Sequence, residues 1–251
     1  MVALLCVLLG LTLPPGLTPG PEIRVEAVTG PAQLRLVDGR VLVLAELHGF
    51  APDERTEPAL DWARQQLAAL IGSDPVATAV DDAFQDRYGR LRAHLMTADG
   101  RWVQEVLLLQ GAALLHPWDP PAAVLSRLRS AEAEARGART GLWARRLSPY
   151  LAEAVPYQAR GRFVIVRGRV HSVGRARRGT FVNFSDDYDS DFTVFVPSGQ
   201  TRAFGGRRSF EAMIGQAVEA RGVLHWWNGP FMRLDRPSLL NVPADAAAGP
   251  P

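Results

Sequence analysis

The sequence predicts an α+β chain that is mainly β, built as one strand-and-helix domain followed by a smaller β-barrel domain. Of its 251 residues, 47% are hydrophobic, which is enough to bury a substantial core. Short alternating runs of apolar and polar residues, bounded by glycine, proline, aspartate or asparagine, recur along the chain and are typical of strands. Apolar residues at helical spacing occur mainly in the first 140 residues.

Residues 1–21 have the composition of an export signal. Met1–Pro21 contains no charged side chain, and Val2–Leu13 is apolar enough for the hydrophobic region of a secretory signal. We therefore expect an exported protein, periplasmic or secreted. The segment has no basic start and no clear cleavage site, so a misassigned start or an uncleaved segment is the alternative. The prolines and glycines after Pro15 argue against a stable transmembrane span. Cys6 is the only cysteine, which excludes an intramolecular disulfide.

Residues 22–146 show the pattern of a first domain. Ala32–Glu46 alternates around Asp38-Gly39, which predicts a β-hairpin. Pro58–Ile71 has helical spacing and is followed by Gly72, a helix stop signal. The other expected elements are strands at Val76–Val80 and Leu91–Thr97, and helices at Trp102–Gln110 and Ala122–Arg139.

Residues 147–160 are expected to be a linker, because Pro149 and Pro156 interrupt regular structure. Residues 161–242 form the second expected domain, and residues 243–251, rich in Ala, Gly and Pro, form an expected disordered tail. Five strands and one short helix are predicted in the second domain: strands at Arg162–Val173, Thr180–Phe184, Phe192–Val196, Gln216–Trp227 and Phe231–Leu234, and a helix at Phe210–Ile214. A helix between the third and fourth of five strands is the order of an OB-type barrel.

Charge is distributed unevenly between the two halves. Glu22–Tyr150 holds 15 arginines against 17 acidic residues, and Leu151–Pro251 holds 13 against 9, so the halves carry about −2 and +4. This favours the second half as the one that faces a polyanion. The alternative is that the excess of arginine in the second half only reflects the composition of the chain, which is rich in arginine and contains no lysine.

A basic and aromatic region in the second domain is the candidate nucleic-acid site. Arg175, Arg177 and Arg178 form a loop between the first two strands, and Phe181 and Tyr188 follow. Barrels of this kind bind single strands by stacking bases on exposed rings while arginines contact phosphates. The strand period of two predicts that Phe181 faces outward with Asn183, while Val182 and Phe184 face the core. A structural or protein-docking role is the alternative.

Aspartates alternate in the loop that follows. Asp187, Asp189 and Asp191 are spaced as at the start of a calcium loop, but Phe192 stands where such a loop requires glycine and Ser198 where it requires glutamate. A solvated loop is expected.

One motif identifies a resemblance that covers roughly residues 23–146. Asp86-Arg87-Tyr88-Gly89-Arg90, followed by Ala98-Asp99-Gly100, Gln110-Gly111 and Gly141-Leu142-Trp143, resembles the thermonuclease (staphylococcal nuclease-like) family in order and spacing. The resemblance implies an OB barrel with about three helices. It also implies Ca²⁺-dependent hydrolysis of DNA or RNA, in which a glutamate activates water and two arginines stabilise the phosphate.

Most of the residues that carry this activity are replaced. The positions that correspond to the metal-binding aspartates, one arginine and the glutamate base are Ala32, Val43, His48 and Ala51, and only Arg90 is retained. We call these five residues the family positions. The interpretation favoured by the sequence is a catalytically degenerate, non-catalytic nucleic-acid-binding or protein-interaction module without a metal cofactor. The alternative is a weak or divergent nuclease that uses Ca²⁺, Arg90 and relocated carboxylates, of which Glu46, Asp53 and Glu54 are the nearest.

Overall fold

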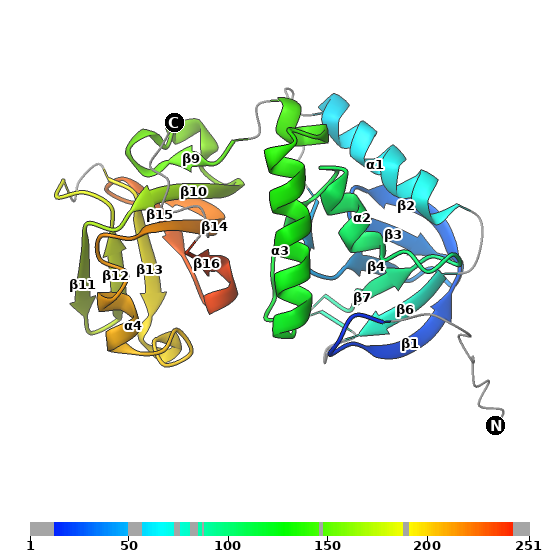
Figure 1. The fold of residues 1–251 in the computed structure, drawn as a ribbon, viewed down its shortest axis with the longest axis horizontal. Helices are drawn as coiled ribbons and strands as arrows, with labels where there is room; N and C mark the ends of the chain where they lie inside the picture. The colour runs from blue at the N-terminus through cyan, green and yellow to red at the C-terminus, as the bar shows by residue number, and fades with distance from the viewer. Residues whose placement is uncertain are drawn as a thin grey trace. The chain divides into compact units, whose positions relative to one another are not determined.

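The computed structural model describes residues 13–49, 57–72, 76–80, 85–86, 88–145, 148–187 and 191–242. The chain divides into two compact units (Figure 1). Unit 1 comprises Met1–Leu115 and Pro120–Arg145, and unit 2 comprises His116–Asp119 and Arg146–Pro251. Helices and antiparallel sheets occur together, so the predicted α+β, strand-rich class is confirmed.

Unit 1 combines a curved sheet with helices. Its strands are β1 (Thr18–Ile23), β2 (Val25–Gly30), β3 (Gln33–Leu36), β4 (Val41–Leu44), β5 (Leu47–His48), β6 (Val76–Val80), β7 (Leu91–Met96) and β8 (Leu114–Leu115). Its helices are α1 (Glu57–Ile71), α2 (Val103–Leu109), α3 (Ala122–Gly137) and the 3-10 turn η1 (Gly141–Arg145). The predicted hairpin is confirmed as β3–β4, and α1, α2 and α3 lie where helices were expected.

The strand order of unit 1 closes a barrel. The sheet runs β1-β6-β7-β4-β3-β2, with β4 and β7 parallel. Because β2 follows β1 directly, these two strands are consecutive parts of one bent stretch that pairs with β6 at one end and with β3 at the other. The core inside the sheet is aliphatic, with Leu34, Leu42 and Leu91 fully buried.

Two glycines hold the end of α2 against the start of η1. Gly111 and Gly141 both have positive φ, 63° and 58°, and the Leu142 N–H donates to the Gly111 carbonyl at 3.0 Å. A Cβ on Gly141 would lie 2.2 Å from the Gln110 carbonyl oxygen, and one on Gly111 equally close to the Thr140 carbonyl oxygen. Only glycine fits this backbone contact.

Unit 2 is an all-β barrel with short helical turns. Its strands are β9 (Tyr150–Leu151), β10 (Phe163–Arg169), β11 (Ser172–Ala176), β12 (Gly179–Asn183), β13 (Thr193–Pro197), β14 (Ala217–Trp226), β15 (Pro230–Arg233) and β16 (Leu240–Asn241). Its helical segments are η2 (Ala152–Ala154), η3 (Tyr157–Ala159), η4 (Ser198–Gln200), α4 (Arg207–Glu211) and η5 (Pro237–Leu239). The order β11-β12-β13-β15-β14-β10, with β13 and β15 parallel, is that of the expected barrel.

One predicted strand in unit 2 is divided in the structure. Arg162–Val173 was expected as a single strand, but β10 pairs with β14 and β11 pairs with β12. The bend lies next to Gly168, where a Cβ would come within 2.6 Å of both the Ala152 side chain and the Phe184 ring. The bend lets one stretch of chain belong to both ends of the sheet and so closes the barrel.

Two boundaries also differ from expectation. β1 begins at Thr18, ahead of the expected start at Glu22, and pairs with β6 through Thr18 and Val80. Pro19, Gly20 and Pro21 remove the alternation by which a strand is recognised in sequence. In the expected linker, β9 pairs with β10, and Ala152, Val155 and Ala159 are buried in the core of unit 2. A two-residue strand carries too short a pattern to predict.

Candidate functional site

Two of the family positions, Val43 and Arg90, lie on the outer face of β4 and beside the start of β7. Val43 of β4 is opposite Gln33 of β3 and beside Arg92 of β7. Leu91 points into the core and is fully buried, so Arg90 and Arg92, on either side of it, lie on the outer face. On this outer face, the position that the resemblance assigns to an arginine is therefore occupied by the aliphatic side chain of Val43.

Arg92 is paired with a buried carboxylate. Its guanidinium donates a short hydrogen bond to Glu46, whose side chain is fully buried, while the Arg92 side chain is 11% exposed. Glu46 has φ 63°, in the left-handed region. Glu46 is one of the carboxylates considered as a relocated catalytic group, and in the structure its charge is balanced by Arg92 and withdrawn from solvent.

Arg90 is also paired with a carboxylate. Its Nε donates to Asp86 Oδ2 at 2.8 Å, and its guanidinium lies 5.3 Å from the centre of the Tyr88 ring. Desolvation raises the pKa of Asp86, but hydrogen bonds from Arg90 and from the Tyr88 N–H outweigh it and keep that pKa below its ordinary value. Asp86 is therefore ionised near neutral pH. The Arg90 side chain is 40% exposed, so part of the guanidinium remains accessible to solvent.

The region around Ala32 and His48 does not fit a calcium ion. Ala32 is buried, and a Cβ on the neighbouring Gly49 would lie 3.7 Å from the Ala32 Cβ. Burial lowers the pKa of His48 to about 4, so its imidazole is neutral near pH 7. Calcium requires several oxygen ligands, which a methyl group and an imidazole do not supply. Ala51, Asp53 and Glu54 lie outside the described residues, and within the described part of the chain no group of His, Cys, Asp or Glu could hold a metal.

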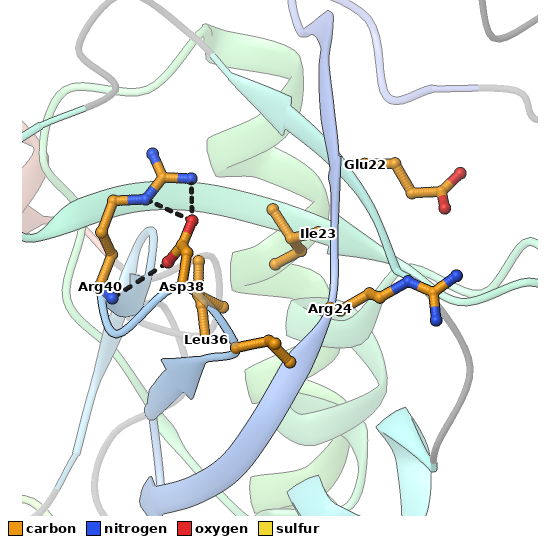
Figure 2. Close-up of a pocket in the computed structure, with 7 residues that line it drawn as sticks. Glu22, Ile23, Arg24, Leu36, Asp38 and Arg40 are labelled. Atoms are coloured by element: carbon orange, nitrogen blue, oxygen red, sulfur yellow. Dashed lines mark hydrogen bonds and ion pairs between the residues drawn. The ribbon is translucent and has the colours of Figure 1, made fainter.

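A surface hollow of about 260 Å³ lies beside the β3–β4 turn (Figure 2). Figure 2 shows the Arg40 guanidinium hydrogen-bonded to the Asp38 carboxylate, while Glu22 and Arg24 point away from this pair. The hydrogen bond from the Arg40 side chain holds the pKa of Asp38 below its ordinary value. None of the family positions lines this hollow, and the adjoining charges of Asp38 and Arg40 cancel.

In unit 2 the structure separates the predicted site residues. Phe181 lies on the outer face of the barrel and is partly exposed, while Val182 is fully buried, as the strand period predicted. Arg177 and Arg178, which we call the basic turn, are exposed between β11 and β12. Arg175 is opposite Thr180, the residue before Phe181 in β12. Because neighbouring residues of a strand point to opposite faces, Arg175 and Phe181 lie on different faces of the sheet. Tyr188 lies outside the described residues.

Further aromatic residues join Phe181 on the outer face. Phe195 of β13 is opposite Phe181, with ring centres 4.9 Å apart. Phe231 of β15 lies 6.1 Å from Phe195, and His225 of β14 lies 6.0 Å from Phe231. We call this row of four rings across β12, β13, β15 and β14 the aromatic face. Phe231 and His225 were missed by sequence reasoning, because the neighbour of β13 is β15 and the chain between these two strands is long.

Asp191 has a structural role in the loop between β12 and β13. Its buried carboxylate accepts hydrogen bonds from the backbone N–H groups of Phe184 and Ser185, at 3.0 and 2.5 Å, and from the Thr193 hydroxyl. These bonds occupy the oxygens that a calcium loop would require. Asp189 lies outside the described residues, while Asp186 and Asp187 are exposed.

Comparison with known proteins supports the resemblance in unit 1. Residues 49–145 match the family model described as staphylococcal nuclease homologue. No curated protein matches the chain. Within the described residues, no helix is long and apolar enough to cross a membrane. The match contains the Tyr88-Gly89-Arg90 motif and the two glycines that join α2 to η1. Residues 49–145 of the chain are therefore similar to the staphylococcal nuclease homologue family.

Proposed function

We propose that this protein binds nucleic acid without cleaving it, with unit 1 as a catalytically degenerate nuclease domain and unit 2 as the binding barrel. It needs no metal cofactor for this role. The observation that carries the proposal is the contrast in charge between the two units. In unit 1 Arg90 and Arg92 are each paired with a carboxylate, whereas the arginines of the basic turn in unit 2 are exposed.

The chemistry of unit 1 supports the loss of hydrolysis. Hydrolysis of a phosphodiester needs a cation or donors at the phosphate and a base for the water. Loss of one transition-state donor costs about 10²–10³-fold in rate, and here ligand, base and arginine positions are all replaced. Arg92 does not compensate for Val43, because Glu46 already balances its charge. Two glycines of the motif, Gly111 and Gly141, serve backbone packing.

The chemistry of unit 2 supports binding. Arg177, Arg178 and Arg233 are exposed, and no ion pair holds them within the described part of the chain. Exposed guanidinium groups suit phosphates, since they present several N–H donors at once. The net charge of about +4 from Leu151 onward adds long-range attraction for a polyanion.

Two assays on the purified full chain test the proposal. Fluorescence anisotropy with labelled DNA and RNA should show binding that weakens as salt rises, because bound phosphates release counterions. A fluorogenic oligonucleotide should remain uncleaved with Ca²⁺. Cleavage that EDTA abolishes would reject the proposal. Absence of binding even at low salt would also reject it and would favour a protein partner for unit 2.

The alternative function is a weak divergent nuclease. It is favoured by the family match and by Arg90, whose side chain is 40% exposed. If cleavage is found, Arg90→Ala should abolish it without changing the thermal unfolding of unit 1. Cleavage that survives this substitution would point to a contaminating enzyme or to other residues.

We also propose that the protein acts outside the cytoplasm. The support is the uncharged, apolar character of residues 1–13. Cell fractionation with an epitope at the C-terminus tests this, and recovery of the protein only in the cytoplasm would contradict it.

A further inference from the structure

The two units share one strand order, and this places the aromatic face at a defined position in the barrel. In both, a bent first stretch pairs at its two ends with different strands, and the third and fifth strands are parallel. Unit 1 has β4 beside β7, with Val43 next to Arg92. Unit 2 has β13 beside β15, with Phe195 next to Arg233 in the same arrangement.

In each unit three residues lie side by side across the second, third and fifth strands, and the side chains of these two rows differ in chemistry. In unit 1 the row is Gln33, Val43 and Arg92, and it carries no ring. In unit 2 the row is Phe181, Phe195 and Arg233. Arg92 is paired with buried Glu46, whereas Arg233 is exposed. The outer face that carries Val43 and Arg92 in unit 1 thus bears, in unit 2, rings and an accessible cation.

The rings of the aromatic face lie on the surface of the sheet and are accessible. Val182, Val194 and Met232, which alternate with them, are fully buried in the core, so the rings point outward. Gly179 makes room for Phe195: a Cβ there would lie 2.5 Å from the ring. Gly174, opposite Phe181, adds no side chain that could cover the other ring. Both phenylalanines are therefore only partly covered.

Cations border these rings on two sides. The basic turn adjoins Gly179, over which the Phe195 ring lies, and the Ser198 N–H donates to the Arg178 carbonyl at 2.9 Å. Arg233 adjoins Phe195 on the next strand. At the other end of β12 and β13, Asp186 and Asp187 are exposed and would repel phosphates. A ligand with flat apolar groups and regularly spaced negative charges complements this pattern.

We propose that the aromatic face of unit 2 binds single-stranded nucleic acid, with unpaired bases stacked on Phe181, Phe195 and Phe231 and phosphates at Arg177, Arg178 and Arg233. This inference rests on the proposed function and adds the class of ligand. Ring centres 4.9 and 6.1 Å apart allow successive bases of an extended strand to contact successive rings. In a duplex the base faces are stacked on one another about 3.4 Å apart and are not accessible.

Anisotropy titrations of the full chain test the inference. The probes are a labelled single-stranded DNA of about 12 nucleotides, the RNA of the same sequence, and the DNA duplex, a length within the site size of such barrels. The single strands should bind at least about tenfold more tightly than the duplex, since several stacking contacts are lost in the duplex. Phe195→Leu and Phe231→Leu should each weaken single-strand binding by roughly 5- to 150-fold.

Leucine keeps most of the apolar packing and removes the aromatic ring, so these variants should fold. Tyr157→Leu is the matched control, because Tyr157 is 50% exposed and packs against Trp226 rather than on the aromatic face. Thermal unfolding of each variant verifies the fold.

The outcomes separate the two proposals. Tighter binding of single strands that both leucine variants weaken, with Tyr157→Leu unchanged, supports the inference. Equal binding of duplex and single strands, unaffected by the leucine variants but weakened by Arg177→Ala, overturns the inference and leaves the proposed function intact. Absence of binding to all three probes at low salt overturns both.

Discussion

The carboxylate of Glu46 and the guanidinium of Arg92 form an ion pair that is withdrawn from solvent, and Arg92 lies beside Val43 on the neighbouring strand. The glutamate side chain is fully buried, the arginine side chain is 11% exposed, and Glu46 has a left-handed backbone. A buried pair is costly to break, because the remaining partner is left as an uncompensated charge. Arg92, which lies beside Val43, therefore has a structural role in unit 1.

Breaking this pair should destabilise unit 1 strongly. Arg92→Met removes the guanidinium that pairs with the buried Glu46 carboxylate and should lower the free energy of unfolding by about 3–5 kcal/mol. The double variant Arg92→Met with Glu46→Gln should recover much of this loss, since no buried charge remains. Urea unfolding of the full chain, followed by tryptophan fluorescence, measures both. Equal losses in the single and double variants would show that the charge is not the cause.

The glycine contact between α2 and η1 should tolerate no side chain. In Gly141→Ala the new Cβ would meet the Gln110 carbonyl oxygen, and alanine would have to adopt φ 58°. We expect a loss of at least about 1–3 kcal/mol of stability. Gly137→Ala is the matched control: it lies at the end of α3 with open space around its Cβ and should stabilise by about 0.5–1 kcal/mol. Differential scanning calorimetry compares the two, and similar melting temperatures would refute the contact.

His48 should make unit 1 sensitive to acid. Burial lowers its pKa from 6.5 to about 4 in the folded chain, so between these values the unfolded chain binds more protons. The contribution of neutral His48 to the free energy of unfolding is therefore fully present above pH 6.5. It falls as the pH drops towards 4, by about 3 kcal/mol at most. His48→Gln should flatten this part of the profile. His171→Gln, at an exposed histidine, should retain the wild-type dependence. Chemical unfolding at a series of pH values tests the difference.

The basic turn should determine the salt dependence of binding. If Arg177 and Arg178 each contact one phosphate, the double alanine variant should reduce the slope of log affinity against log salt by about 1.4, or 0.7 per contact with a single strand. Arg160→Ala is the control, because Arg160 lies over the Tyr157 ring away from the basic turn. Anisotropy at several salt concentrations gives the slopes. An unchanged slope in the double variant would place the phosphates elsewhere.

Local patterns allowed much of the fold to be predicted. The β3–β4 hairpin, α1 and the division between Phe181 and Val182 follow from periodicity and turn residues, which act over a few positions. β1 and β9 could not be predicted in this way. β1 contains two prolines and a glycine, and β9 has only two residues, so pairing with β6 and β10 is what makes them strands.

Some features of the candidate sites could likewise be predicted from the sequence, and others depend on strand pairing. The proposed replacement of acidic and basic side chains by Ala32, Val43 and Ala51 comes from the sequence alone, through the motif around Arg90. The pairing of Glu46 with Arg92 joins residues 46 positions apart and depends on the parallel register of β4 and β7. Arg175 appeared to belong with Phe181, but strand register assigns it to the other face.

By itself the sequence determined that the chain carries nuclease-like motifs and an arginine-rich second half, and it is the basis for proposing that most of the catalytic groups are absent. Only the tertiary structure decided that Arg92 is neutralised and that Phe181, Phe195, Phe231 and His225 form one row. The physical reason is that charge neutralisation and ring stacking act across neighbouring strands. Which strands become neighbours is set by closure of the barrel, through contacts between residues far apart in the chain.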